Sequence, residues 1–270
     1  MIFCNLKILS IKKIVQVIQE IVGLDLKNYI YVSLKIKMEL FCDKFKIDSF
    51  DILINKITND KSFLNNFLRF IYNGSFELFR DPSLWRFVKK EILEKHKSKL
   101  HYRVFFPSSY QGADLFSFLI LRQELNLVQE IEVIYATPLE ILDQAQNGYV
   151  FEKRIHELNL SNYKRVETNG LIDQYFIKEL NILKPIPDLF KNTQYHNFNE
   201  TEQVFNKKAD VIFYRNRLLD FNKNLQQIVI ENLFNSLKPG GLFILGVKER
   251  LKKTGLVVFE EKESIYKKEI

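Results

Sequence analysis

The chain has 270 residues, of which 46% are hydrophobic and 27% are charged. This balance supports a packed core with a hydrated surface and excludes a disordered chain, and the length favours about two domains. The net charge of +7 comes from scattered basic residues. Because no basic block with interleaved aromatic residues is present, we expect no nucleic-acid partner.

Cysteine and histidine usage argues against metal or disulfide chemistry. The 2 cysteines are too few for a disulfide framework, and the 4 histidines are dispersed without metal-ligand spacing. No apolar run reaches the about 18 residues that a membrane span requires. The first ten residues lack the charged start and the cleavage site of a signal peptide. We therefore expect a cytoplasmic protein without a metal and without membrane insertion.

The first 73 residues show helical spacing throughout. The apolar face of a first helix, which is expected to end at Gly23, consists of Ile11, Ile14, Val15, Ile18 and Ile21. A second helix is expected over about residues 28–44, a third after a cap at Asp48 or Ser49, and a fourth after a cap at Ser62. Helices joined by short loops pack as a bundle. The sequence predicts a small all-helical N-terminal domain over residues 1–76.

From residue 77 onwards, strands alternate with helices. Pro82 suits the first turn of a helix, and strands are expected over residues 102–106, 132–136, 211–216 and 242–245, with helices over 116–124, 139–146 and 225–237. This alternation predicts an α/β domain with a doubly wound, mostly parallel sheet over residues 77–270. Residues 150–196 are expected to be irregular, Lys238-Pro-Gly-Gly241 to be a turn, and residues 257–259 and 265–266 to form an antiparallel pair.

The strand at residues 211–214 ends in two strong hydrogen-bonding residues, Arg215 and Asn216. Ligands of open α/β sheets bind just outside the carboxyl ends of the strands. Two interpretations follow: the pair faces a ligand, or it hydrogen-bonds neighbouring backbone groups.

The order of these segments resembles that of a known family. The helical domain, the linker Phe79-Arg80-Asp81-Pro82, the Arg215-Asn216 strand end, Leu237-Lys-Pro-Gly-Gly241 and Leu245-Gly-x-x-Glu249 are similar to the CheR-type methyltransferases. The resemblance implies a Rossmann-like sheet and methyl transfer from S-adenosylmethionine to glutamate side chains of a chemoreceptor cytoplasmic domain. The target carboxylate is ionised at neutral pH, so no strong general base is required and no catalytic residue is assigned.

The resemblance also implies cofactor contacts at Arg80, Gly112, Asn197, Phe198, Arg215 and Asn216. Arg80 either grips the methionine carboxylate or pairs with Glu77 or Asp81 at the surface. Gly112 either allows close approach of the cofactor or only starts a helix.

The chain departs from the family at several of these positions. Ala113 replaces a loop glutamate, Pro138 replaces the aspartate that binds the ribose hydroxyls, and Asp220 replaces a tyrosine near the reacting methyl group. Asp220 is expected to act as a helix N-cap rather than as a catalytic acid. No three-stranded receptor-tail-binding insert is evident in residues 150–196. These losses favour an alternative function, in which a catalytically impaired member acts as an interaction or scaffolding module.

Overall fold

The computed structural model describes residues 6–72, 76–96, 102–107, 112–137, 149–150, 152–166, 170–180 and 182–270. Contacts group the chain into two compact units, Met1–Gly74 with Arg217–Ile228, and Ser75–Asn216 with Val229–Ile270. The domain boundary expected at residue 76 stays a prediction, and the two units are described separately below. Within the described ranges, no helix is long and apolar enough to cross a bilayer.

The helical unit contains α1 (Ile8–Val22), α2 (Tyr31–Phe45), α3 (Phe50–Asn59), α4 (Lys61–Tyr72) and the short η6 (Leu218–Asp220). Helix α1 ends as predicted at Gly23, which adopts the left-handed conformation with φ 74°. The Ser49 hydroxyl accepts the Ile52 N–H at the start of α3. The predicted cap at Ser62 is wrong, because α4 begins at Lys61 and the Asp60 carboxylate accepts the N–H of Phe63.

Asp220 fastens residues 217–221 to helix α2 inside this unit. Its carboxylate accepts hydrogen bonds from Ser33 Oγ at 2.6 Å and Lys37 Nζ at 2.5 Å. The guanidinium of Arg217 lies 3.7 Å away. Burial raises the pKa of Asp220, but the charges of Lys37 and Arg217 and the hydrogen bonds outweigh burial and lower it overall. The predicted capping role of Asp220 is wrong, because α9 (Lys223–Ser236) begins later.

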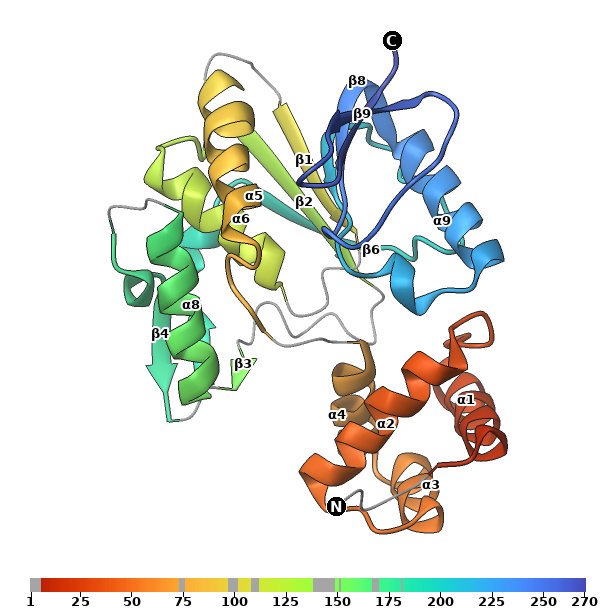
Figure 1. Cartoon of the computed structure of the whole chain (residues 1–270). Coiled ribbons are helices and arrows are strands. Elements are labelled where there is room, and N and C mark those ends of the chain that lie inside the picture. Colours follow the sequence, from red (N-terminus) through yellow and green to blue (C-terminus); the bar gives the residue numbers. More distant parts are fainter. Residues whose placement is uncertain are drawn as a thin grey trace. The chain divides into compact units, whose positions relative to one another are not determined.

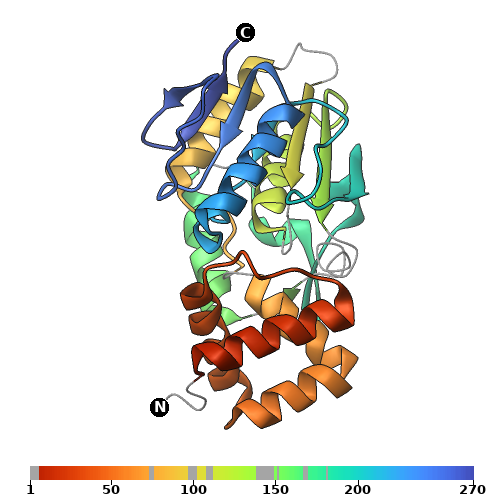
Figure 2. The ribbon, with the colours of Figure 1, turned by 90° about the vertical axis from the view of Figure 1, so that its right-hand side faces the viewer.

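The second unit is built on a seven-stranded sheet (Figures 1 and 2) with the order β6-β2-β1-β7-β8-β10-β9. Its strands are β1 (Tyr102–Pro107), β2 (Ile131–Thr137), β6 (Thr193–Asn197), β7 (Ala209–Phe213), β8 (Leu237–Ile244), β9 (Leu256–Glu260) and β10 (Ile265–Lys268). The first five strands in this order are parallel, and β10 and β9 pair antiparallel. The predicted doubly wound α/β class and the final antiparallel pair are confirmed.

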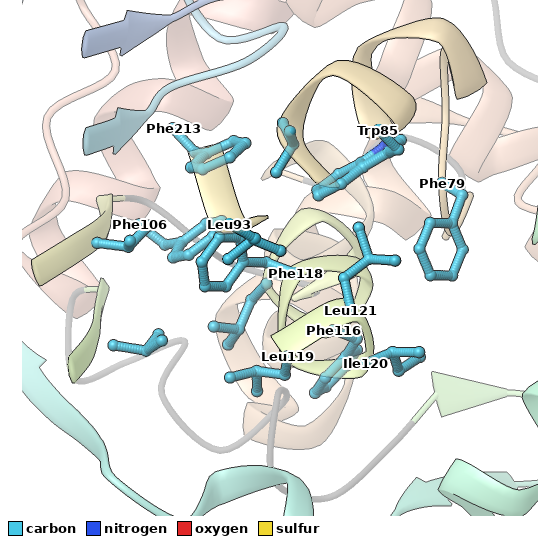
Figure 3. Packing of buried hydrophobic residues seen from close by; sticks show 14 of the residues in the cluster. Phe79, Trp85, Leu93, Phe106, Phe116, Phe118, Leu119, Ile120, Leu121 and Phe213 are labelled. Carbon is cyan, nitrogen blue, oxygen red and sulfur yellow. The ribbon is translucent and has the colours of Figure 1, made fainter. Parts of the chain in front are cut away.

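An aromatic core lies between the sheet and the helices that follow the linker. These helices are α5 (Pro82–Phe87), the π-helix η1 (Val88–Leu93), the 3-10 turn η2 (Glu94–His96) and α6 (Ala113–Glu124). Trp85 is fully buried and stacks on Phe213 at 5.8 Å between ring centroids, and Phe106 stacks on the same ring at 4.7 Å. Figure 3 shows these rings with Phe79, Phe116 and Phe118 around them. The core thus holds the linker helix against the end of β7.

The prediction of irregular structure over residues 150–196 is wrong. The segment contains α8 (Lys153–Arg165), the 3-10 turns η4 (Ile172–Tyr175) and η5 (Pro187–Phe190), and a small antiparallel sheet in the order β3-β5-β4, with β3 (Tyr149–Val150), β4 (Phe176–Glu179) and β5 (Ile182–Pro185). Helix α8 buries two asparagines, Asn159 and Asn162, so it lacks a recognisable apolar stripe. Strands of two to four residues are too short to show alternation.

Lys238-Pro-Gly-Gly241 does not form the predicted turn. The motif lies inside β8, where the pairing with β7 shifts register between Ala209 and Val211. Leu237 to Leu242 on β8 lies opposite Ala209 to Val211 on β7, so the motif is an irregular stretch at the start of the strand, in which Gly240 adopts φ 74°. The predicted helix over residues 139–146 lies outside the described residues.

We expect Asp220→Ala to lower the free energy of unfolding by roughly 2 kcal/mol at neutral pH, because charge-assisted hydrogen bonds are lost. The folded-state pKa of Asp220 is lowered, so its contribution is present above the unfolded pKa of about 4 and is lost as the pH falls through the folded value. Urea unfolding at neutral and acid pH measures both effects. Asp51→Ala, at an exposed position in α3, is the control, and equal losses for the two variants would contradict the account.

Candidate functional site

The carboxyl ends of the parallel strands meet along one edge of the sheet. Strand order reverses between β1 and β7, which lie side by side although β2 follows β1 in the chain. Ligands of doubly wound sheets bind in the crevice at such a switch point. Pro107, Thr137 and Asn197 end β1, β2 and β6 at this edge, and Arg215 follows the end of β7 by two residues. The topology therefore brings the predicted strand-end residues to one edge.

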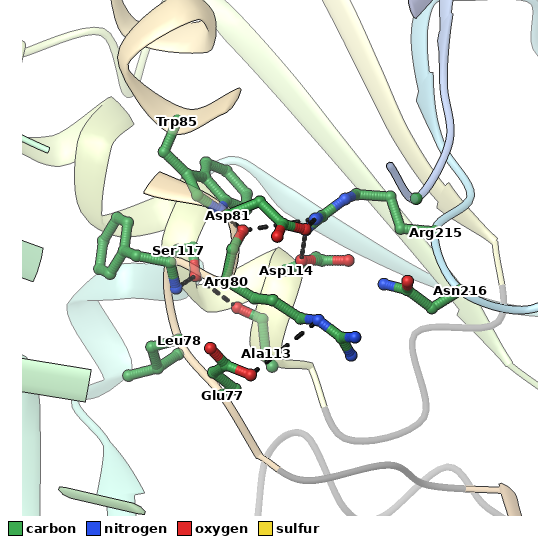
Figure 4. A network of polar contacts seen from close by, with 12 residues as sticks. Glu77, Leu78, Arg80, Asp81, Trp85, Ala113, Asp114, Ser117, Arg215 and Asn216 are labelled. Atoms are coloured by element: carbon green, nitrogen blue, oxygen red, sulfur yellow. Dashed lines mark hydrogen bonds and ion pairs between the residues drawn. The ribbon is translucent and has the colours of Figure 1, made fainter. Parts of the chain in front are cut away.

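Arg215 is held by two carboxylates of its own unit. Its side chain is 0% exposed. It donates from Nη2 to Asp81 Oδ2 and from Nη1 to Asp114 Oδ1, each at 2.6 Å. A third contact of 3.3 Å joins Nη2 to the carbonyl oxygen of Arg80. Figure 4 shows the guanidinium pointing at both aspartates. Arg215 thus ties together the linker, the first turn of α6 and the end of β7.

The linker backbone around Arg80 is fixed on both sides. Phe79 and Asp81 both have positive φ, 52° and 60°, a conformation that persists in non-glycine residues only where the surroundings enforce it. The enforcing contacts include the Ser117 hydroxyl, which accepts the Phe79 N–H, and the Trp85 indole N–H, which donates to the Arg80 carbonyl.

Asparagines of α8 hold the residues just before this turn. Asn159 Oδ1 accepts the Leu78 N–H at 2.9 Å, and Asn162 Nδ2 donates to the Leu78 carbonyl at 3.1 Å. Both side chains are buried, so each unmade bond would be costly. Sequence reasoning missed these residues because it searched the segment for apolar periodicity.

The Arg80 side chain, in contrast, remains accessible. It is 43% exposed, and its ion pair with Glu77 has a separation of 3.9 Å. Of the two surface ion pairs considered for Arg80 from the sequence, the structure shows the one with Glu77. Asp81 forms its ion pair with Arg215 instead. In Figure 4 the Arg80 guanidinium and the Asn216 amide lie on the same side of the Arg215 ion pairs. Because this ion pair is long, the Arg80 guanidinium retains N–H donors for the carboxylate of a ligand.

Asn216 forms a tight turn with the chain that follows β8. Its φ is 57°, and its N–H donates to Glu249 Oε2 at 2.8 Å. The same oxygen accepts the Gly246 N–H at 2.8 Å. A Cβ at Gly246 would lie 2.5 Å from Asn216 Oδ1, so glycine is required there. The Leu-Gly-x-x-Glu motif therefore has a structural role, because the buried Glu249 carboxylate fixes the backbone of Asn216.

Gly112 adopts φ 75° immediately before α6, which favours glycine. Its carbonyl accepts the N–H of Phe116 at 2.7 Å, so its helix-starting role is observed. Ala113 opens the helix, and its carbonyl accepts the Ser117 hydroxyl. Pro138 lies outside the described residues, so the predicted loss of the ribose-binding aspartate stays a sequence observation.

Asn197 and Phe198 differ in what they offer to a ligand. Asn197 pairs in register with Thr137 and is exposed. Phe198 is 2% exposed and packs edge-on against Phe105 and Phe205 at centroid distances of 5.5 and 5.6 Å. The Phe198 ring therefore belongs to the core, while Asn197 is an exposed residue at the end of β6.

Thr137 is a site residue that sequence reasoning did not select. Its hydroxyl is buried and has no hydrogen-bond partner among the described residues. An unsatisfied buried hydroxyl costs about 1–3 kcal/mol, so this atom suggests a partner that the described residues do not supply. The accessible guanidinium of Arg80 fits a carboxylate, and the Thr137 hydroxyl fits one further polar group.

We expect Arg215→Met to lower the free energy of unfolding by about 3 kcal/mol, because two carboxylates lose their shared buried cation. Arg86→Met, at an exposed position in α5, is the matched control and should cost under about 1 kcal/mol. Chemical denaturation monitored by circular dichroism measures both. A stability loss for Arg215→Met no larger than that of the control would show that its ion pairs are not structural.

Comparison with known proteins shows the family of the chain. The family model described as "CheR methyltransferase, SAM binding domain" matches residues 75–265. The Pseudomonas putida protein named "Putative methyltransferase Cher3" is 23% identical over 244 residues, which cover 89% of this chain and 88% of the relative.

Two chemotaxis protein methyltransferases also match. The Listeria innocua protein is 23% identical over 87% of this chain and 88% of its own length. The Salmonella typhimurium protein is 24% identical over 58% of this chain and 56% of its own length. The family match extends over well more than half of the chain, so the chain belongs to the CheR family of S-adenosylmethionine-dependent methyltransferases.

Proposed function

We propose that this chain methylates glutamate side chains of a chemoreceptor cytoplasmic domain, within the cytoplasm. The family match and the relatives named as chemotaxis protein methyltransferases support a protein substrate in chemotaxis. The observation that carries the proposal is the accessible Arg80 guanidinium, which lies in the linker anchored to the switch point through Arg215.

Arg80, Gly112, Asn197 and Asn216 are the proposed cofactor contacts. Arg80 would pair with the methionine carboxylate through a bidentate, charge-assisted contact. Gly112 lets the backbone before α6 approach the ligand closely. Asn197, with its exposed amide at the end of β6, would meet the adenine. The Thr137 hydroxyl adds a buried donor and acceptor beside it.

Arg215 and Phe198 would act through their neighbours. The guanidinium of Arg215 already contacts Asp81 and Asp114, so its proposed role is to fix the Arg80 backbone. The Phe198 ring packs in the core and would hold the Asn197 backbone at the strand end. Both are positioning residues in this proposal.

S-adenosylmethionine, when bound, supplies an electrophilic methyl group on a sulfonium. Transfer of this methyl group to a glutamate carboxylate oxygen, with loss of the carbon–sulfur bond, would yield a methyl ester and S-adenosylhomocysteine. The attacking carboxylate is ionised at neutral pH, so no proton has to be removed. The residues of the chain therefore contribute by aligning the reactants and by excluding water.

A second candidate function is a methyltransferase-fold interaction module. Ala113 and Pro138 stand where the resemblance expects carboxylates. Near the Arg80 linker, Asp81 and Asp114 each give one carboxylate oxygen to Arg215, so only their second oxygens remain as acceptors for the ribose. The two candidates therefore differ in a measurable property, the affinity for the cofactor.

We expect S-adenosylhomocysteine to bind the purified chain, and Arg80→Ala to weaken binding by tenfold or more, because a hydrogen bond to a charged group contributes about 1.5–3 kcal/mol. Isothermal titration calorimetry measures the affinity. Arg86→Ala, which changes an exposed arginine of α5, the helix that follows the linker, should bind like the wild type. An absence of binding at millimolar ligand would favour the interaction module.

We further expect methyl transfer to a chemoreceptor cytoplasmic fragment. With S-adenosylmethionine labelled in its methyl group, the label should enter the fragment, be released as methanol by mild base, and disappear when the modified glutamates are changed to glutamine. Base-stable label would indicate a different acceptor. Cofactor binding without any transfer would reject the chemoreceptor as the substrate.

A further inference from the structure

The second unit has a cavity at the edge of the sheet opposite the strand ends that lead to Arg215 and Asn216. Strands β1, β7 and β8 are parallel, so their first residues lie together at this amino edge. The cavity has a volume of about 370 Å³, which is in the range of roughly 300–1,000 Å³ of small-molecule sites. The residues that line it from η1, η2 and the strands include Glu91, Lys95, Tyr102, Asp210, Phe259 and Lys267.

The two carboxylates that line the cavity are already paired with lysines. Glu91 in η1 forms an ion pair with Lys95, one turn further along the chain. The Oδ2 atom of Asp210 accepts the Lys238 ammonium at 2.7 Å and the Arg103 backbone N–H at 2.8 Å. Each pair is neutral as a whole, so neither pair gives the cavity a net charge.

Lys267, in β10, is the cation that remains. Among the residues that the structure describes, no carboxylate forms an ion pair with its ammonium. Its Nζ lies 5.8 Å from the centroid of the Phe259 ring, in a cation–π contact. Because the other charges of the cavity cancel, Lys267 leaves it with an excess of one positive charge.

Tyr102 adds an aromatic ring without adding a charge. The residue is 4% exposed, and burial together with the charge of Asp210 raises the pKa of its hydroxyl. The phenol therefore stays neutral at physiological pH and leaves the excess charge of Lys267 uncompensated. The cavity thus combines one unpaired ammonium with the aromatic rings of Tyr102 and Phe259.

We propose that this cavity binds a small aromatic carboxylate, at a site separate from the one at the carboxyl ends of the strands. The ligand carboxylate would pair with the Lys267 ammonium, and its ring would pack against the apolar surface of Tyr102 and Phe259. A dianion such as phosphate fits less well, because Glu91 and Asp210 at the cavity repel its second negative charge.

Titration of the full chain with benzoate, followed by two-dimensional amide NMR, tests the proposal. Saturable shifts should appear at the amides of β10 and of the start of β1, with a dissociation constant on the order of 1 mM, since so small a ligand has a limited binding free energy. Inorganic phosphate should cause no such shifts. The absence of saturation at about ten times that benzoate concentration, or shifts located elsewhere, would overturn the proposal.

Variants of Lys267 test its role as the anchor. Lys267→Met should weaken benzoate binding about tenfold or more, because a hydrogen bond to a charged group is lost, and Lys267→Arg should retain binding. Lys262→Met, at an exposed position before β10, is the matched control and should bind like the wild type. Equal affinities of Lys267→Met and the control would overturn the proposal.

The charge balance and the separation of the two sites have tests of their own. Glu91→Gln releases Lys95 from its ion pair, so the affinity for benzoate should rise about twofold or more. Arg80→Ala changes the opposite edge of the sheet and should bind benzoate like the wild type. An unchanged or lower affinity in Glu91→Gln, or a loss of benzoate binding in Arg80→Ala, would contradict the assignment, whatever the affinity for the cofactor.

Discussion

A guanidinium removed from water must be matched by carboxylates, and that requirement governs the site. Arg215 has no exposed side-chain surface and has carboxylates of Asp81 and Asp114 at 2.6 Å. The cost of burying this charge is offset only if both partners stay in place. Because the partners come from the linker and from α6, one interaction fixes the strand end, the helix start and the turn that carries Arg80.

The same constraint gives the two arginines of this region different roles. Arg215 is the more buried arginine and acts on the protein itself, whereas Arg80 is 43% exposed and faces away from the ion pairs. The surrounding contacts serve the backbone of this region: Glu249 holds Asn216, and Asn159 and Asn162 hold Leu78. The contacts of these residues thus fix the backbone at the switch point, and we propose that ligand recognition there uses few side chains, since Ala113 and Pro138 replace the acids that the family resemblance expects.

Sequence reasoning recovered the features that follow a simple period or a strong local signal. The helix ending at Gly23, the strand leading to Arg215 and the doubly wound sheet were all predicted. It failed where the buried face of a helix carries polar side chains and where strands are only a few residues long. Helix α8 was missed because its buried face carries Asn159 and Asn162. Lys238-Pro-Gly-Gly241 has the residues of a turn but forms the irregular start of β8. The two carboxylates that bind Arg215 and the side chains that hydrogen-bond to Asp220 are more than 100 residues distant in the chain, and no local pattern specifies them.

A crystal structure of the chain with S-adenosylhomocysteine tests the division between Arg215 and Arg80 most directly. The account predicts that the Arg215 guanidinium stays between Asp81 and Asp114, while the Arg80 guanidinium contacts the carboxylate of the ligand. A structure in which Arg215 leaves both aspartates and binds the ligand, with Arg80 turned to solvent, would contradict it.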